Sequence, residues 1–197
     1  YIYDSLAEGH SIWIAQKEGR AKDGFDQTDP ALLKMLQLQG RKQKKEFAEY
    51  VRELKIVPVS ISYQYEPCAI AKAKELYHKQ QHGQYVKQQG EDIASIVEGF
   101  STAKGHVHLA FGEPIESGCE SPEELAKTID QQIVDSFFLH PGNYIAGGCT
   151  QAVINEKDAA AFNERIAKVP EELKPLVLAM YAKPFHRKAE LATSESK

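Results

Sequence analysis

Several features are scarce in this sequence. It has three cysteines in 197 residues, Cys68, Cys119 and Cys149, and no two of them form a Cys-x-x-Cys pair. Their number and spacing argue against a disulfide framework and a zinc site, and favour a reducing cytoplasm. No apolar run approaches the roughly 20 residues of a spanning helix, so we expect any membrane contact to be peripheral. Acidic residues outnumber basic ones by 28 to 24, which leaves no positive excess to favour nucleic acid.

What the chain does contain is an alternation of short apolar runs and helical patterns. Strands are predicted at residues 11–15, 55–63 and 106–111, the second being rich in β-branched side chains. Strands separated by helices imply right-handed crossovers, so we expect an α/β fold with a mostly parallel sheet flanked by helices. We expect residues 1–150 to form the C-terminal half of an α/β domain, and residues 151–197 a helical C-terminal extension with a frayed tail.

Two helix starts carry clear local signals. Asp29 precedes Pro30, a pair that suits an N-cap followed by the first helical position, and Gly40 is expected to end that helix. Ser121 and Glu124 form a predicted capping box, which opens a helix whose apolar residues recur at helical spacing.

The turn from Gln16 to Gly24 is the strongest candidate for a binding site. It follows the first predicted strand, and the carboxyl ends of parallel strands are where open α/β sheets bind ligands. Arg20 and Lys22 are both suited to gripping a phosphate, Gly19 permits close approach of the backbone, and Glu18 is placed to orient Arg20. The same composition is also typical of a solvated loop that holds one ion pair.

These residues resemble a known family. Glu18-Gly19-Arg20, followed by Lys22-Asp23-Gly24, is similar to the Glu-Gly-Thr-Arg-Ser block of glycerol-3-phosphate and 1-acylglycerol-3-phosphate acyltransferases. Ile56-Val57-Pro58-Val59-Ser60 resembles the proline-containing strand block of that family, in particular of a bacterial subgroup. In this chain Arg20 follows Gly19 directly, without the threonine of the common motif. The shorter turn leaves open whether Arg20 or Lys22 holds the phosphate.

The resemblance implies an acyltransferase of phospholipid biosynthesis. Its donor would be acyl-CoA or acyl carrier protein, and its acceptor a hydroxyl of glycerol 3-phosphate or a lysophospholipid. The implied substrate-binding residues are Glu18, Gly19, Arg20, Lys22 and Pro58. No metal and no tightly bound cofactor is implied, and no nucleic acid partner. The implied location is cytoplasmic, at the inner face of a bacterial membrane.

The family's catalytic motif, His-x-x-x-x-Asp, is not found in the 197 residues. None of the seven histidines has an aspartate five positions later, and His108 alone has an acidic residue there, Glu113. Acyl transfer needs a base for the acceptor hydroxyl and a partner that orients this base. We therefore expect the chain to be part of a longer polypeptide, and inactive by itself.

Two alternatives remain open at the level of sequence. One is a non-catalytic module that binds lipid or phosphate and shares the acyltransferase fold. The other is an α/β protein with a metal bound by His106 and His108, which are two residues apart and so point to the same face of their predicted strand. A structural role for these two histidines is the simpler interpretation.

Overall fold

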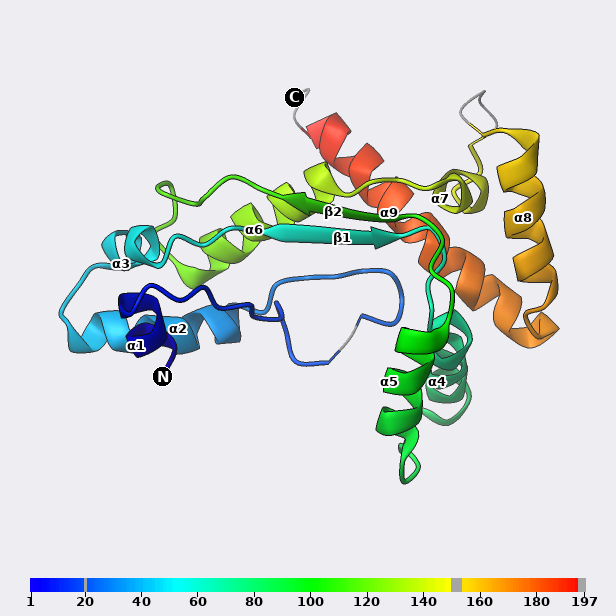
Figure 1. The fold of residues 1–197 in the computed structure, drawn as a ribbon, viewed down its shortest axis with the longest axis horizontal. Helices are drawn as coiled ribbons and strands as arrows, with labels where there is room; N and C mark the ends of the chain where they lie inside the picture. Colours follow the sequence, from blue (N-terminus) through cyan, green and yellow to red (C-terminus); the bar gives the residue numbers. More distant parts are fainter. Residues whose placement is uncertain (20, 150–153, 195–197) are drawn as a thin grey trace. The chain divides into compact units, whose positions relative to one another are not determined.

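A computed structural model describes residues 1–19, 21–149 and 154–194 of the chain (Figure 1). Helices dominate these residues, and two short strands accompany them. The helices are α1 (Ile2–Ala7), α2 (Pro30–Lys42), α3 (Phe47–Leu54), α4 (Ala69–His82), α5 (Glu91–Ser101), α6 (Pro122–Ser136), α7 (Pro141–Ala146), α8 (Glu156–Ala167) and α9 (Lys174–Ser194). The strands are β1 (Val59–Tyr63) and β2 (Val107–Phe111), and a 3-10 turn, η1, covers Glu171–Leu173.

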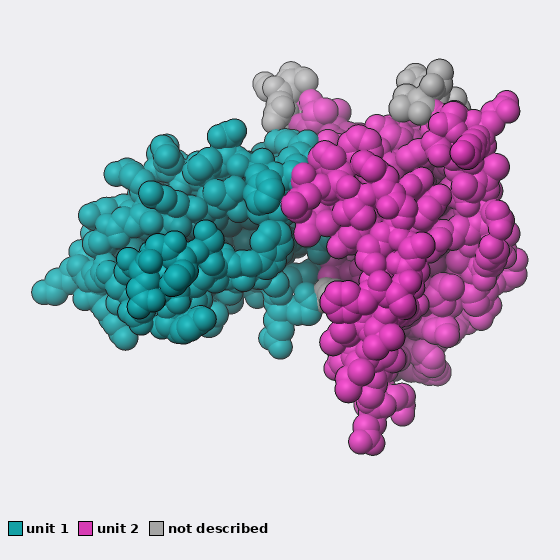
Figure 2. Space-filling view, viewed as in Figure 1, with its two compact units in different colours: residues 1–20, 26–60, 110–136 teal, residues 21–25, 61–109, 137–197 magenta. Residues whose placement is uncertain are grey.

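The chain divides into two compact units (Figure 2). Unit 1 consists of residues 1–20, 26–60 and 110–136, and unit 2 of residues 21–25, 61–109 and 137–197. Each unit has a buried apolar cluster of its own. The sequence suggested a different division, between residues 1–150 and 151–197, and that division stays a prediction.

Helix α2 of unit 1 begins where the sequence predicts. Asp29 Oδ1 accepts a hydrogen bond from the backbone N of Ala31 (2.8 Å), and Pro30 occupies the first helical position, where its missing N–H costs nothing. The prediction that Gly40 ends the helix is wrong, because α2 continues for two more residues. A β-carbon at Gly40 would come within 2.6 Å of the Tyr50 ring. Gly40 therefore lets α2 pack closely on α3.

Helix α6 begins at the predicted N-cap residue, Ser121, and supplies one side of the unit 1 core. Ser121 Oγ accepts a hydrogen bond from Glu124 N (3.2 Å), whereas the Glu124 carboxylate accepts one from Glu120 N (2.7 Å), one residue before the N–H that the predicted capping box requires. The apolar stripe of α6 is buried, with Leu125 only 1% exposed. The core of unit 1 consists of Leu33, Phe47, Val51, Ile115, Cys119, Leu125, Ala126 and Ile129.

The expected parallel sheet is contradicted by the structure. The two strands of the described chain, β1 and β2, pair with each other in antiparallel orientation. Backbone hydrogen bonds run from Gln64 N to His106 O (2.8 Å) at one end of the sheet and from Gly112 N to Pro58 O (2.8 Å) at the other. The protein is thus mostly helical, with a two-stranded sheet.

The direction of β2 follows from the two helices between the strands. After β1, α4 leads the chain away, and α5 leads it back, so that Lys104 O accepts a hydrogen bond from Tyr65 N (2.9 Å). Because β2 starts beside the end of β1, it must run in the opposite direction. A crossover to a parallel strand would have to return the chain to the beginning of β1.

The strand predicted at residues 11–15 is also wrong. This segment has neither helical nor strand structure, and Trp13 is 66% exposed instead of buried. A strand needs a neighbour for its backbone N–H and C=O groups, and no strand in the described part of the chain pairs with this segment.

The part of the sheet that belongs to unit 2 has a polar buried face and an apolar exposed face. Successive residues of a strand point to opposite faces. Ser62 is buried and His108 is half-buried, whereas Ile61, Val107 and Leu109 are exposed. This is the reverse of the usual arrangement, in which a sheet turns its apolar side to the core.

Helix α9 is the central helix of unit 2, where it packs against α4 and α7. The hydroxyl of Tyr181 accepts a hydrogen bond from Glu66 N (2.8 Å), and the Tyr181 carbonyl accepts one from Asn143 Nδ2 (2.9 Å). Pro184 lies inside α9 and has no N–H to donate to the carbonyl of Met180, four residues earlier. The core of unit 2 consists of Ala73, Phe162, Val169, Leu173, Val177 and Tyr181.

Helix α5 turns its large apolar side chains outward. Ser95 and Gly99 face inward, where Cys68 Sγ donates to the carbonyl of Ser95 (3.6 Å) and a β-carbon at Gly99 would lie 3.8 Å from the same sulfur. The exposed side chains recur at helical spacing and are Ile93, Ile96, Val97 and Phe100. Within the described residues, no helix combines the length and apolarity that crossing a membrane requires.

Candidate functional site

The loop of residues 21–25 is seated on α9 in unit 2. Gly24 has a φ of +75°, a conformation that favours glycine, and a β-carbon at this position would collide with the carbonyl oxygen of Met180. That carbonyl is the one that Pro184 leaves without its usual donor in the helix. Because Gly24 has no side chain, the loop can therefore lie directly against this part of the α9 backbone.

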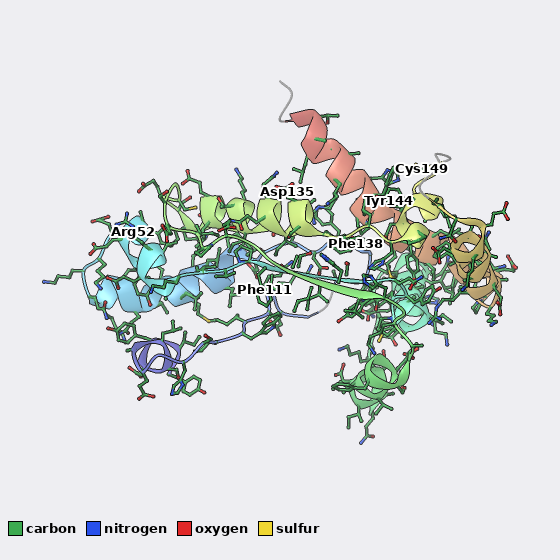
Figure 3. The ribbon with its side chains drawn as sticks, turned by 45° about the horizontal axis from the view of Figure 1, so that its top comes forward. Arg52, Phe111, Asp135, Phe138, Tyr144 and Cys149 are labelled. Carbon is green, nitrogen blue, oxygen red and sulfur yellow. The ribbon has the colours of Figure 1, made fainter. Side chains whose placement is uncertain are left out.

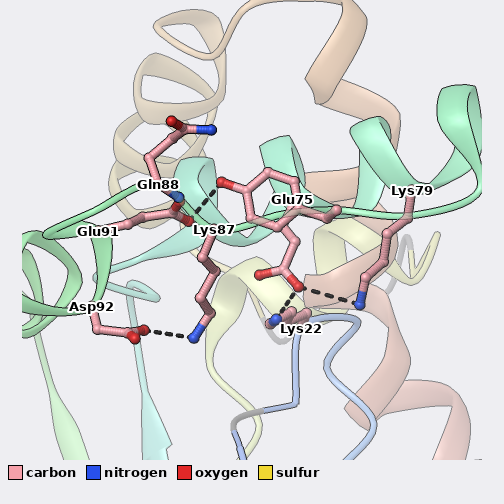
Figure 4. A network of polar contacts seen from close by, with 8 residues as sticks. Lys22, Glu75, Lys79, Lys87, Gln88, Glu91 and Asp92 are labelled. Carbon is pink, nitrogen blue, oxygen red and sulfur yellow. Dashed lines mark hydrogen bonds and ion pairs between the residues drawn. The ribbon is translucent and has the colours of Figure 1, made fainter.

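Lys22 connects the same loop to α4. Its ammonium group forms an ion pair with Glu75, and Lys79 Nζ lies 3.2 Å from the same carboxylate oxygen (Figure 4). Burial raises the pKa of Glu75, but the hydrogen bonds from Lys22 and Lys79 outweigh it and hold this pKa below its usual value. One nearly buried carboxylate thus holds two cations, which leaves a positive charge in excess in this group of three.

Phe25 brings two more cations to the loop. The guanidinium carbon of Arg187 lies 4.2 Å from the centre of the Phe25 ring, and Lys183 Nζ lies 5.1 Å from it. Both distances are those of cation–π contacts. Asp23 Oδ1 accepts a hydrogen bond from Phe25 N (3.1 Å) and so fixes the backbone that carries the ring. Positive side chains of the loop itself, of α4 and of α9 therefore lie close to residues 21–25.

The predicted site residues are divided between the two units. Glu18 and Gly19 are exposed in unit 1, and Gly19 has a φ of +77° with no atom within 4 Å of a β-carbon placed there. Lys22 belongs to unit 2, and Pro58 is buried in unit 1, at the start of β1. Arg20 lies outside the described residues. A common site for these residues stays a prediction.

Three histidines gather on the polar face of the sheet in unit 2. The ring of Phe138, labelled in Figure 3, lies 5.6 Å from that of His106, 5.0 Å from that of His108 and 4.9 Å from that of His140. Within the described chain, no three histidine, cysteine or acidic side chains are arranged to hold a metal ion. The aromatic ring in contact with all three imidazoles instead favours the structural interpretation of this cluster.

The same cluster contains buried polar atoms that have no hydrogen-bond partner among the described residues. They are the hydroxyl of Ser62, Nδ1 of His108 and Nε2 of His140. His140 is 2% exposed. Burial lowers the pKa of His140, a hydrogen bond with the backbone of Ser62 raises it, and the nearby His106 and His108 lower it further. The net result is a pKa below the usual value, which favours a neutral imidazole.

Sequence reasoning named Lys22 as a candidate site residue but did not name the residues around it. Glu75 and Lys79 lie four residues apart on α4, and Lys183 and Arg187 lie four apart on α9, a spacing that places each pair on one side of its helix. That spacing was visible in the sequence. The contact with Lys22, 53 residues before Glu75, had no local signal.

Comparison with known proteins gave no match to any protein family, any curated protein or any solved structure. The resemblance to acyltransferases therefore depends on the motif residues themselves.

Proposed function

We propose that these 197 residues carry the acceptor-binding part of an acyltransferase. The enzyme would move a fatty acyl group from acyl-CoA or acyl carrier protein to a hydroxyl of glycerol 3-phosphate or a lysophospholipid. The observation that carries this proposal is the collection of cations around residues 21–25, directly after the Glu18-Gly19-Arg20 block. Lysine and arginine beside flexible glycines are the groups that bind phosphate in proteins.

Each residue of the block has a role in this proposal. Arg20 grips the acceptor phosphate with its two-pronged guanidinium, and Lys22 adds a point charge. Glu18 orients Arg20, and the open space around Gly19 lets the phosphate approach the backbone. Pro58, which directly precedes β1, is proposed as a substrate-binding residue from the resemblance alone.

The chemical step needs one more group. A base takes the proton of the acceptor hydroxyl, and the oxygen bonds to the thioester carbonyl carbon. The carbon–sulfur bond then breaks, and the base returns its proton to the leaving sulfur, which departs as the thiol. Without an aspartate five residues after any histidine, the 197 residues offer no match to the family's base, so it would come from outside them. The reaction belongs to bacterial phospholipid biosynthesis, with the enzyme in the cytoplasm and in peripheral contact with the inner face of the membrane.

Acyl transfer by the full-length polypeptide tests this proposal. Arg20→Ala and Lys22→Gln are each expected to raise the KM for the phosphate-bearing acceptor by about tenfold or more, and to leave the KM for the acyl donor unchanged. Lys79 still pairs with Glu75 in the Lys22→Gln variant, so the carboxylate is not left alone. Lys157→Gln, which removes the same charge from an exposed position of α8, is the control. An unchanged acceptor KM in both loop variants would refute the assignment.

A second candidate is a non-catalytic module that binds phosphate or lipid. The missing His-x-x-x-x-Asp motif favours it. A full-length polypeptide that lacks this motif, transfers no acyl group and still binds glycerol 3-phosphate would establish the module and exclude the enzyme.

A further inference from the structure

We propose that His78 and His82 of α4 form a binding site for a divalent transition-metal ion of the class of Zn²⁺ and Ni²⁺. The two imidazoles are the protein ligands, and water completes the coordination of the ion. The site lies within unit 2 and does not depend on the proposed acyl transfer. The resemblance to acyltransferases assigns neither histidine a role.

The spacing of the two histidines brings their rings to one side of α4. Residues four apart lie one helical turn apart on the same face, and the ring centres of His78 and His82 are 5.7 Å apart. Two imidazoles that share a tetrahedral metal ion have ring centres about 5 Å apart, because each ligating nitrogen lies about 2 Å from the ion. Both side chains are exposed, so a small rotation about their χ angles brings the two nitrogens onto one ion.

The chemistry of the two donors selects the class of metal. Neutral imidazole nitrogens suit Zn²⁺, Ni²⁺ and Cu²⁺, whereas Mg²⁺ and Ca²⁺ require oxygen ligands. Among the residues that the structure describes, no third histidine, cysteine or carboxylate completes a set of three ligands. The site is therefore a two-point chelate on a helix face, like the paired histidines of the His-x-x-x-His spacing in metal-binding helices.

Two nearby side chains that carry oxygen are already engaged. The Glu75 carboxylate, one turn before His78, is held by two lysines. The ring of Tyr85 lies 5.8 Å from that of His78, but its hydroxyl donates a hydrogen bond to Glu91 Oε1 (2.6 Å). This bond raises the pKa of Tyr85 to about 12, so the phenol keeps its proton and is a poor metal ligand. The imidazoles are left as the donors.

The place of the pair at the end of α4 also bears on its charge. Helix α4 ends at His82, and Gly83 follows in a left-handed conformation with a φ of +75°. The last carbonyls of a helix give its end a partial negative charge, which favours a cation. Lys74 and Lys79 lie within one turn of His78 and repel a cation. Electrostatic attraction alone thus does not hold an ion here, and the two metal–nitrogen bonds supply the affinity.

Isothermal titration of the tag-free 197-residue chain with Zn²⁺ and with Ni²⁺ tests the proposal. A single ion should bind to each chain, and an excess of Mg²⁺ should not displace it. His78→Gln and His82→Gln are each expected to raise the Kd by about tenfold or more, because each variant loses the chelate and keeps one imidazole. His106→Gln removes a histidine from the cluster on the sheet, and it is the control that should leave the Kd unchanged.

A change of spacing separates chelation from a mere supply of imidazole. The double variant His82→Gln with Gln80→His keeps the number of histidines but places the pair two residues apart, on different sides of α4. It should bind as weakly as His82→Gln. Positions 80 and 82 are both exposed, so the double variant should fold like the wild type.

Thermal unfolding separates binding from folding. Without metal, all variants should unfold at the wild-type temperature. With Ni²⁺, that temperature should rise for the wild type and stay unchanged for His78→Gln and His82→Gln. A wild-type chain that binds neither ion overturns the proposal, and so does a spacing variant that binds as tightly as the wild type. Binding that is lost in His106→Gln and kept in His78→Gln would overturn it as well. None of these results bears on acyl transfer, which its own assay decides.

Discussion

Helices α5 and α6 carry similar apolar stripes and use them in opposite ways. In α6 the stripe is buried in the core of unit 1, and Leu125 is almost inaccessible. In α5 the stripe points away from unit 2, with Phe100 84% exposed, and the small residues Ser95 and Gly99 face inward. Both stripes have helical spacing, but this spacing does not determine which side of each helix is buried.

The two faces of the sheet in unit 2 also differ in whether their polar or their apolar residues are buried. Its buried face carries Ser62 and His108, and its exposed face carries Ile61 and Leu109. An exposed apolar side chain contributes little to folding, whereas a buried one is worth several kcal/mol. The difference between the two kinds of surface can be measured by substitution.

The largest expected effect is in α6. Leu125→Ala should lower the free energy of unfolding by about 2 to 5 kcal/mol, because it leaves a cavity in the unit 1 core. Phe100→Ser in α5 should change it by no more than about 0.5 kcal/mol. Urea denaturation followed by circular dichroism measures both. A loss of 2 kcal/mol or more in Phe100→Ser would mean that the stripe of α5 is covered in the folded protein.

Replacing two glycines inside helices is expected to change the free energy of unfolding by a smaller amount, and in opposite directions for the two positions. Gly40→Ala in α2 should destabilise the chain by about 1 to 3 kcal/mol, because the added methyl group would meet the Tyr50 ring at 2.6 Å. Gly99→Ala in α5 should stabilise it by about 0.5 to 1 kcal/mol, since the methyl group would lie 3.8 Å from Cys68 Sγ and alanine favours the helix. Equal destabilisation by both substitutions would show that α5 packs as tightly as α2.

The polar face of the sheet gives a third test, through pH. The pKa of His140 lies below its unfolded value of about 6.5, so the unfolded chain takes up a proton first as the pH falls. Stability from this group is complete above that value and is lost as the pH drops below it. The urea midpoint should therefore fall between pH 7 and pH 5, and His140→Gln should reduce that fall. His82→Gln, an exposed histidine of α4, should not, and an equal slope in both variants would contradict the prediction.

Local signals predicted the helices better than the sheet. The start of α2 at Asp29 and that of α6 at Ser121 depend on contacts within four residues, and the structure confirms both. The direction of β2 depends on where α4 and α5 return the chain, which no local pattern encodes. Residues 11–15 have the composition of a strand, but a strand also needs a partner.

The candidate site shows the same limit. Lys22 was predicted from its place beside glycines and other charges, which is a local pattern. Glu75, Lys183 and Arg187 come from helices far along the chain, and only the folded unit brings them to the loop. Helical spacing in a sequence shows which residues share one side of a helix. It does not show which distant residue of the chain they contact.

The loop of residues 21–25 makes unit 2 discontinuous along the chain. Its other segments begin at residue 61, so the unit cannot complete itself until a short segment from near the start of the chain returns to α4 and α9. Contacts of such high sequence separation raise the contact order and slow folding. They also set a practical limit on dissection: a fragment that starts after residue 25 lacks the loop side chains that contact α4 and α9, and unit 2 is best studied with residues 21–25 attached.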